Sequence, residues 1–504
     1  MTILTGLAIG MTTSVFATNL LWVLLLANWV IEWQWAERWQ ALRNNRLLQA
    51  FLLLAAVHLV WLLGTENLAY GLYDLQKKLP LFVIPLVVLT SKPLQRKELL
   101  PVAAAYCLTV LTVSLVGLGR YLTIPDLPYR NLVPHISHIR FGLNICLIIC
   151  IILYLMLHCR VWWQHLVGAA LILWLLLFLL MLRAYTAFII LTITAVVLLL
   201  AYGHRLPRRL RHAATLTLTL ILLSAAALTG FYLYDYYHLR PLSTAPLQSF
   251  TPNGNPYLHR QDGLVENGNY VHYYVCEQEL RQEWGKVSSF PFDSITSTGY
   301  TVYPALLRYL GAMGYTKDSL GMTHLQPADI QAIEKGIANP VYLHPGPRKM
   351  FYVLFYEFEN FRCFRSISNF SSLQRIELWR NAWQVFLRHP LFGVGTGDVA
   401  DQCRQQMEAT HSPLADSGMH THNQYLNFLL AFGLVGFLLI LLSFIRAIHV
   451  EHLCRSALFT ALLCIVLISF ISEDTLETLA GITFVALGLS ILKPTDNTCT
   501  NTTP

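Results

Sequence analysis

The stretch FLLMLRAYTAFIILT, residues 178–192, places one charged residue, Arg183, between two long apolar runs. These runs cover residues 165–182 and 184–202, and each has about the length that an α-helix needs to cross the hydrocarbon core of a bilayer. Lipid offers no hydrogen-bond partners to the backbone, so a chain made of such runs crosses a membrane as helices. The stretch therefore predicts two membrane helices joined by a very short turn.

Apolar runs of this kind continue along the whole chain. The stretch from Ile3 to Val30 has no cationic start and no clear cleavage site, which favours retained membrane helix over a signal peptide. Further runs lie at about 47–64, 79–91, 98–118, 139–158, 212–236, 422–445, 456–471 and 475–492. We predict an all-α polytopic membrane protein with about 12 transmembrane helices, or about eleven if Ile3–Val30 is a single tilted helix.

The composition supports this class. Of the 504 residues, 55% are hydrophobic and only 12% are charged, whereas roughly a quarter of the residues of a soluble domain are charged. The net charge of +7 is explained by basic cytoplasmic loops. Membrane lipids are therefore the expected surroundings, and no nucleic-acid partner is expected.

The loops alternate in charge, which predicts the topology. Short basic loops lie at 37–46, 91–98, 158–165, 203–212 and 446–455. Such loops mark the cytoplasmic face, so the long segment 237–421 and the acidic SEDTLE loop at 472–477 lie outside. We predict three parts: N-terminal transmembrane helices (1–236), a large external loop region (237–421), and C-terminal transmembrane helices with a short tail (422–504).

The external loop region is predicted to mix helical and irregular structure. Its first half carries turn signals without a sustained period, which indicates turns and short strands. SSLQRIELWRNAWQVFLRH (371–389) has serine N-cap candidates and apolar residues at helical spacing, and it ends at Pro390. One disulfide is possible among Cys276, Cys363 and Cys403 in an oxidising space, and the pairing stays open.

Two arginines lie at the outer ends of predicted helices. Arg183 separates two spans, and Arg140 begins another in HISHIRFGLNICLII. A lone arginine at a helix end is often a snorkelling side chain. Two cations away from the positive-inside face weaken that interpretation, because charge at this depth is costly.

Two further arginines, Arg375 and Arg380, lie on the helix predicted at 371–389. Their spacing places them on different stripes, so at most one faces the protein with the apolar side. The simpler alternative is an amphipathic helix with a solvated charged face. The GVGTGD segment at 393–398 is not a P-loop; its glycine amides suit an anion, but such a segment is more often a turn.

HTHNQYLNFLLAFGLVG, residues 420–436, sets His420, His422 and Asn423 directly before an apolar run. No carboxylate cluster stands beside the histidines, so we predict no metal site and no cofactor. The glycines Gly433 and Gly436 permit the close approach of a neighbouring helix and would fix His422 at the outer end of this one. Asn423 is predicted to cap the helix or to support His422, and His420 to contact an acceptor.

RIELWRNAWQVFLRHPLFGVGTGD followed by HTHNQYLNFLLAFGLVG resembles the signature region of the bacterial O-antigen ligase superfamily, over about residues 370–445. LRAYTAFIIL around Arg183 and the layout of helices with one large external loop support the resemblance. The superfamily also contains O-antigen polymerases and protein O-oligosaccharyltransferases.

The resemblance implies a metal-independent, inverting glycosyltransferase of the bacterial inner membrane. Such enzymes move a glycan from undecaprenyl diphosphate, the donor, to an acceptor hydroxyl at the periplasmic face. It implies that His422 is the general base and that Arg375, Arg183 and Arg140 bind the diphosphate. Arg380, on the same predicted helix as Arg375, is a candidate supporting residue. Arginine bridges phosphate oxygens while staying cationic, and a histidine can accept the hydroxyl proton near neutral pH.

Ligation of O-antigen to lipid A–core is the function that we predict. Within the superfamily, a polymerase and a protein O-oligosaccharyltransferase stay open as alternatives. A polysaccharide transporter or flippase is disfavoured, because the charges cluster at one lip and the external segment has no counterpart in the other half of the chain.

Overall fold

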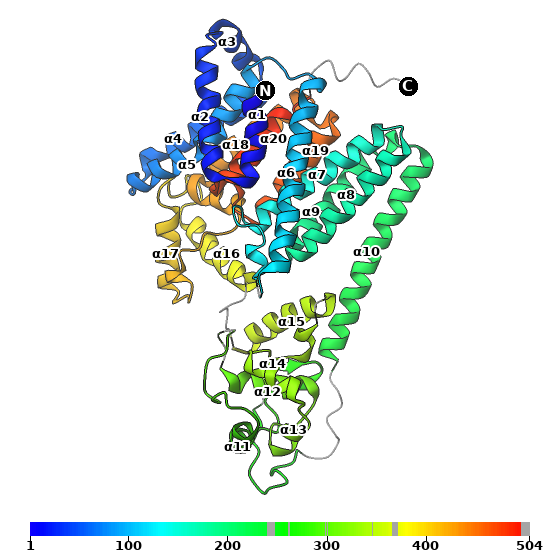
Figure 1. The fold of residues 1–504 in the computed structure, drawn as a ribbon. Coiled ribbons are helices and arrows are strands. Elements are labelled where there is room, and N and C mark those ends of the chain that lie inside the picture. Colours follow the sequence, from blue (N-terminus) through cyan, green and yellow to red (C-terminus); the bar gives the residue numbers. More distant parts are fainter. Residues whose placement is uncertain are drawn as a thin grey trace. The chain divides into compact units, whose positions relative to one another are not determined.

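The computed structural model describes residues 1–125, 127–238, 247–260, 263–297, 299, 301–344, 346–364 and 371–494, and Figure 1 labels its elements. Contacts divide the chain into two compact units. The first comprises Met1–Leu218 with Arg375–Pro504, and the second comprises Thr219–Gln374. Residues 375–494 thus pack with the N-terminal helices, although the boundaries predicted at 236 and 421 stay predictions.

The first unit is a bundle of helices. Its N-terminal part contains α1 (Thr2–Thr13), α2 (Val15–Ile31), α3 (Trp35–Asn44), α4 (Arg46–Val60), η1 (Trp61–Gly64), α5 (Leu68–Thr90), α6 (Arg96–Thr123), η2 (Tyr129–Asn131), α7 (His138–His158), α8 (Trp162–Met181), α9 (Tyr185–Tyr202) and η3 (Gly203–Arg205). Its C-terminal part contains α17 (Val399–Ala409), η5 (Ala415–Ser417), α18 (Gln424–Val450), η6 (Leu453–Arg455), α19 (Ala457–Ser472), η7 (Thr475–Glu477) and α20 (Leu479–Ile491). In sequence, α10 (Arg208–Tyr237) and α16 (Ser371–Arg388) each run across a boundary between the units.

The predicted apolar runs lie in helices, and two of them show why boundaries differ. Ile3–Val30 forms two helices, because Ser14 has an extended backbone and its Oγ caps α2 by accepting from Ala17 N at 3.2 Å. Helix α5 begins at Leu68, well before the apolar run, because Asn67 Oδ1 caps it by accepting from Tyr70 N at 3.1 Å. Capping chemistry set both boundaries.

The all-α polytopic class is confirmed. Among the described residues, seven helices are long and apolar enough to cross a membrane, or eight if the bent pair α2 and α3 is one span. Three shorter apolar helices are Thr2–Thr13, Ala457–Ser472 and Leu479–Ile491. The number of spans that the sequence predicts therefore stays a prediction.

Helices from both ends of the sequence build one core in the first unit. Helix α20 packs on α5 and α1, α18 packs on α4, and α19 packs on α7 and α9 (Figure 1). The middle of this core is α7, where every residue from Phe141 to Ile152 is buried. The C-terminal helices are thereby fixed against the N-terminal ones, which brings loops that are distant in sequence to common positions.

Helix α18 is broken at Gly433, which has φ +63° and ψ −168°. The backbone of residues 390–395 fills the break: Leu434 N donates to Pro390 O (2.8 Å), Val435 N to Leu391 O (3.0 Å), Val394 N to Leu430 O (2.8 Å) and Gly395 N to Ala431 O (3.0 Å). A Cβ on Gly433 would lie 2.3 Å from the Leu391 carbonyl oxygen. The neighbour that Gly433 admits is therefore this segment and not, as predicted, another helix.

The other glycines of this region also serve packing. A Cβ on Gly436 would lie 3.2 Å from the Trp61 ring, so a side chain from the end of α4 approaches closely there. In the GVGTGD segment, the amides of Val394 and Gly395 bond to α18, and Gly397 N donates to Thr65 Oγ1 at 3.2 Å. These amides are occupied, so the segment is a packed turn rather than an anion cradle.

The second unit mixes short helices with one hairpin. The hairpin agrees with the turns and short strands predicted for the first half of the external region, but three helices also lie in that half, where none was predicted. The unit contains β1 (Val265–Glu266), β2 (Asn269–Tyr270), α11 (Glu277–Val287), α12 (Val302–Met313), α13 (Ser319–Thr323), α14 (Pro327–Glu334), η4 (Pro340–Leu343) and α15 (Pro347–Phe364). The two strands are antiparallel, with Val265 opposite Tyr270. Cys276 and Cys403 are free thiols, so no disulfide joins any two of the three cysteines of the predicted loop region.

Candidate functional site

The N-terminal end of α18 is held by hydrogen bonds around Thr421. Asn423 is the N-cap, as predicted, since its Oδ1 accepts from a backbone N–H of the first helical turn at 3.0 Å. Thr421 Oγ1 donates to Asn427 Oδ1 at 2.6 Å, and Trp379 of α16 donates from Nε1 to the Thr421 carbonyl at 2.9 Å. His422 lies within this network with φ +50°, a conformation that costs a non-glycine residue free energy and needs such support.

Two buried carboxylates on the loop after α19 lie beside His422. Asp474 Oδ1 is 3.8 Å from His422 Nδ1 and 3.3 Å from an Nη of Arg140. Glu473 Oε1 is 2.8 Å from an Nη of Arg375. These five residues, called here the His422 cluster, come from α7, α16, the entrance to α18 and the loop after α19, and all belong to the first unit. In the sequence, Glu473 and Asp474 stand out only as acidic residues of a loop.

The cluster has hydrogen-bonding capacity that the described residues do not use. Arg140 Nε and His422 Nδ1 are buried and have no hydrogen-bond partner among the described residues. For His422 Nδ1, the 3.8 Å contact to Asp474 is too long to be a hydrogen bond. Arg375 commits one N–H donor of its guanidinium to Glu473. A buried unsatisfied donor costs about 1–3 kcal/mol, so an anionic oxygen placed here would be stabilised.

The environment pushes the pKa values of the two carboxyls in opposite directions. Burial raises the pKa of Glu473 above its ordinary value, and the charges of Arg375 and Arg140 offset this only in part. Burial also acts on Asp474, but the proximity of His422 and the charge of Arg140 outweigh it, so the pKa of Asp474 is lowered. Asp474 is therefore a carboxylate at neutral pH, and its negative charge acts on the His422 ring at 3.8 Å.

Among the described residues, His422, Glu473 and Asp474 form a group that could hold a metal ion, with ligand atoms within 4.8 Å of one another. The expectation that no carboxylates stand beside the histidines was wrong, because the acidic loop after α19 folds back onto them. Arg140 and Arg375 already face these two carboxylates. A metal ion would have to replace the contacts of the two arginines with these carboxylates. The prediction that the site works without a metal ion is therefore taken up as a proposal below.

Arg183 lies close to the cluster without joining it. Its guanidinium stands over the Tyr129 ring at 5.0 Å, and that ring packs edge-on against His138 at the start of α7, with centroids 5.4 Å apart. The side chain is exposed and has no ion-pair partner within the described part of the chain. Arg380 is exposed on α16 and does not reach the carboxylates that Arg375 meets, in agreement with the expectation that at most one of the two faces inward.

A buried ionic network lies next to the cluster, and no sequence pattern predicted it. Lys78 of α5 is 2.6 Å from Asp74 Oδ2 and 3.0 Å from Glu477 Oε2. Gln424 Nε2 donates to Glu477 Oε1 at 3.3 Å, and Leu476 N donates to Gln424 Oε1 at 2.9 Å. The network therefore ties the entrance of α18 to the loop that carries Glu473 and Asp474.

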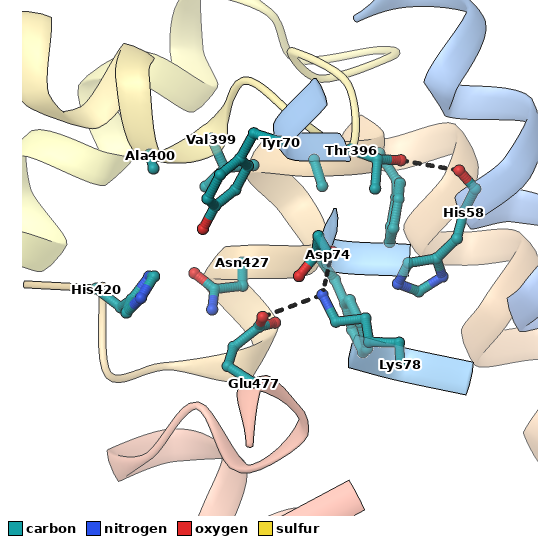
Figure 2. Close-up of a pocket in the computed structure, with 13 residues that line it drawn as sticks. His58, Tyr70, Asp74, Lys78, Thr396, Val399, Ala400, His420, Asn427 and Glu477 are labelled. Carbon is teal, nitrogen blue, oxygen red and sulfur yellow. Dashed lines mark hydrogen bonds and ion pairs between the residues drawn. The ribbon is translucent and has the colours of Figure 1, made fainter. Parts of the chain in front are cut away.

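A pocket with about 460 Å³ of space, including its open mouth, adjoins this network (Figure 2). Its lining comprises His58, Tyr70, Asp74, Lys78, Thr396, Val399, Ala400, His420, Asn427, Phe428, Ala431, Phe432 and Glu477. His420 is thus separated from His422 in role: it lines the pocket, while His422 contacts Asp474. From the sequence, His422 was predicted to be the general base and His420 to contact an acceptor, but no sequence pattern predicted the pocket itself.

Comparison with known proteins identifies one family. Residues 350–441 match the family model described as O-antigen ligase. The matched segment includes Arg375 and His422, while Arg140, Arg183, Glu473 and Asp474 lie outside it. No curated protein matches the chain.

Proposed function

We propose that this chain, a polytopic membrane protein that carries a domain of the O-antigen ligase superfamily in residues 350–441, is a glycosyltransferase that ligates O-antigen to lipid A–core. The donor is a glycan on undecaprenyl diphosphate, and the acceptor is a hydroxyl at the periplasmic face of the inner membrane. One observation carries the proposal: the His422 cluster sets a histidine and two arginines in contact with a buried pair of carboxylates.

In the proposed reaction His422 is the general base. The Asp474 carboxylate favours the tautomer with the proton on Nδ1, which leaves Nε2 free to accept a proton. The acceptor hydroxyl gives its proton to Nε2 as its oxygen bonds to the anomeric carbon of the donor. Attack from the face opposite the diphosphate inverts the configuration at that carbon.

The arginines stabilise the leaving group. The bond between the anomeric carbon and the phosphate oxygen breaks, and undecaprenyl diphosphate departs with the electron pair. Arg183, exposed and without an ion-pair partner in the described chain, and the unused donors of Arg140 and Arg375 would neutralise the charge that develops there. No metal ion is required in this scheme, so added chelator is expected to leave the rate unchanged.

The test is transfer in vitro from undecaprenyl diphosphate-linked glycan to rough lipopolysaccharide by the full-length protein. His422→Ala should abolish transfer, because no other group takes the proton, while His449→Ala, an exposed histidine at the other end of α18, should transfer normally. Equal thermal stability of the two variants would exclude misfolding. Full activity of His422→Ala would overturn the proposal.

The same assay tests the diphosphate contacts. Arg375→Lys keeps a positive charge for Glu473 but loses the planar guanidinium, so we expect transfer to fall by roughly tenfold or more. Arg388→Lys, on the last turn of the same helix and exposed, is the matched control and should behave like wild type. Equal rates for both variants would remove Arg375 from the site.

Disruption of the gene separates ligation from the other activities of the superfamily. Loss of all glycan-capped lipopolysaccharide indicates a ligase, and a cap of a single repeat indicates a polymerase. An unchanged lipopolysaccharide pattern together with unglycosylated protein indicates a protein O-oligosaccharyltransferase. The first result is the one that we expect.

A further inference from the structure

The pocket beside the His422 cluster contains polar atoms that the described residues leave unsatisfied. Asn427 is only 9% exposed, and its Oδ1 accepts from Thr421, which leaves its Nδ2 to donate into the pocket. The Tyr70 hydroxyl and the His420 ring also line the pocket without a hydrogen-bond partner in the described chain. Figure 2 shows Tyr70, His420 and Asn427 together, next to the ion pairs of Lys78. The pocket therefore offers donors that a ligand would satisfy.

The charge of the pocket selects the kind of ligand. Lys78 is its single cation and lies between two carboxylates, Asp74 and Glu477, so the buried network carries a formal charge of −1. A phosphate would be repelled here, because the repulsion between like charges is weakly screened in a buried site. The arginines that suit a diphosphate lie instead in and beside the His422 cluster. The pocket thus suits an uncharged, polar group.

We propose that this pocket binds one neutral sugar unit of a substrate. Sugar hydroxyls both donate and accept, which matches the donors of Tyr70 and Asn427 and the carboxylate of Asp74. The proposal rests on the proposed function, because it places the sugar next to the histidine that would activate the acceptor.

The pocket adjoins the reaction site through two short links. His420 lies two residues before His422, and Glu477 lies on the same turn of chain as Asp474. A sugar held in the pocket would therefore present a hydroxyl or an anomeric carbon toward His422. The sugar belongs either to the acceptor or to the lipid-linked donor. Both present hydroxyl groups that the pocket would recognise by the same hydrogen bonds.

The test measures binding by the full-length protein in lipid nanodiscs. All variants carry His422→Ala so that no turnover occurs. The probes are undecaprenyl diphosphate, undecaprenyl diphosphate-linked glycan and rough lipopolysaccharide. Tyr70→Phe removes only the hydroxyl, and Asn427→Asp keeps the acceptor for Thr421 while removing the donor. Tyr73→Phe is the matched control, because Tyr73 lies on the same helix, is 56% exposed and does not line the pocket.

We expect Tyr70→Phe and Asn427→Asp each to weaken the binding of one sugar-bearing probe by about five- to tenfold, the loss of one hydrogen bond. The probe that is affected identifies the source of the sugar. Binding of bare undecaprenyl diphosphate should stay unchanged, and Tyr73→Phe should bind all three probes like its parent.

Three results would overturn the inference: unchanged affinity for both sugar-bearing probes, an equal loss for bare undecaprenyl diphosphate, or no binding of either sugar-bearing probe. Failure of the proposed function would show differently. It would appear as full transfer activity of the His422→Ala protein, which the binding measurements do not involve.

Discussion

Asp474 shows how one residue sets the chemistry of the His422 cluster. It contacts His422 and Arg140 at once and is buried among them, and these contacts lower its pKa despite the burial. A group whose pKa is lower in the folded state contributes stability above its unfolded-state pKa and loses it as the pH falls through the folded value. The cluster is therefore expected to be less stable in acid.

Asp474→Asn tests whether the stability that Asp474 contributes is lost as the pH falls. The variant lacks the charge at every pH, so its melting temperature should lie below that of wild type at pH 7, and the difference should shrink below about pH 4 as wild type becomes protonated. The measurement is thermal unfolding of the purified protein at several pH values. Asp416→Asn, an exposed aspartate without an ion pair among the described residues, is the control and should match wild type throughout. A difference that stays constant down to pH 3 would contradict the assignment.

At the residue scale the sequence predicted the cations of the cluster but not its anions. Arg140, Arg375 and His422 stand out in the sequence, because a charged group at the edge of a membrane is costly and usually has a function. Glu473 and Asp474 sit in a loop whose acidity already fits its predicted outer location, so no local signal separates them from ordinary loop charge. Only the packing of α19 and α20 against the N-terminal helices brings that loop to His422.

The element that positions His422 is a broken helix rather than a continuous one. The break at Gly433 admits residues 390–395, whose backbone continues the hydrogen bonding that the helix loses. This segment connects α16, which carries Arg375, to α17. The insertion therefore links the position of Arg375 to that of His422. Periodicity cannot predict such a break, because the residues around Gly433 are apolar on every side and fit a straight membrane helix equally well.

Gly433→Ala should disrupt this link. A methyl group would meet the Leu391 carbonyl oxygen at 2.3 Å on a backbone with φ +63°, so both the contact and the conformation are unfavourable. We expect a loss of stability of about 2 kcal/mol or more, seen as a lower melting temperature and reduced yield of folded protein. Gly119→Ala is the matched control, since Gly119 lies in α6 and a Cβ there meets nothing within 4 Å. Equal stability of the two variants would show that the break tolerates a side chain.

At the scale of the whole molecule, loop charge and the proposed site predict the same orientation of α18 in the membrane. The His422 cluster lies at the start of α18, and the basic loop with Cys454 follows the end of the same helix. A helix of 27 residues is about 40 Å long, which suffices to cross a bilayer even with a break. The two ends should therefore face opposite sides, with the basic end in the cytoplasm.

Cysteine labelling from outside tests this orientation without altering the site. Glu408→Cys places an exposed thiol on α17, which precedes His422 in the sequence. The native Cys454 is an exposed thiol that follows the other end of α18. In intact spheroplasts, a membrane-impermeant maleimide should label residue 408 and spare Cys454. After permeabilisation it should label both, with each site read by mass spectrometry. Labelling of Cys454 in intact spheroplasts with protection of residue 408 would place His422 in the cytoplasm, where a periplasmic glycan acceptor is absent, and would remove the proposed function together with the topology.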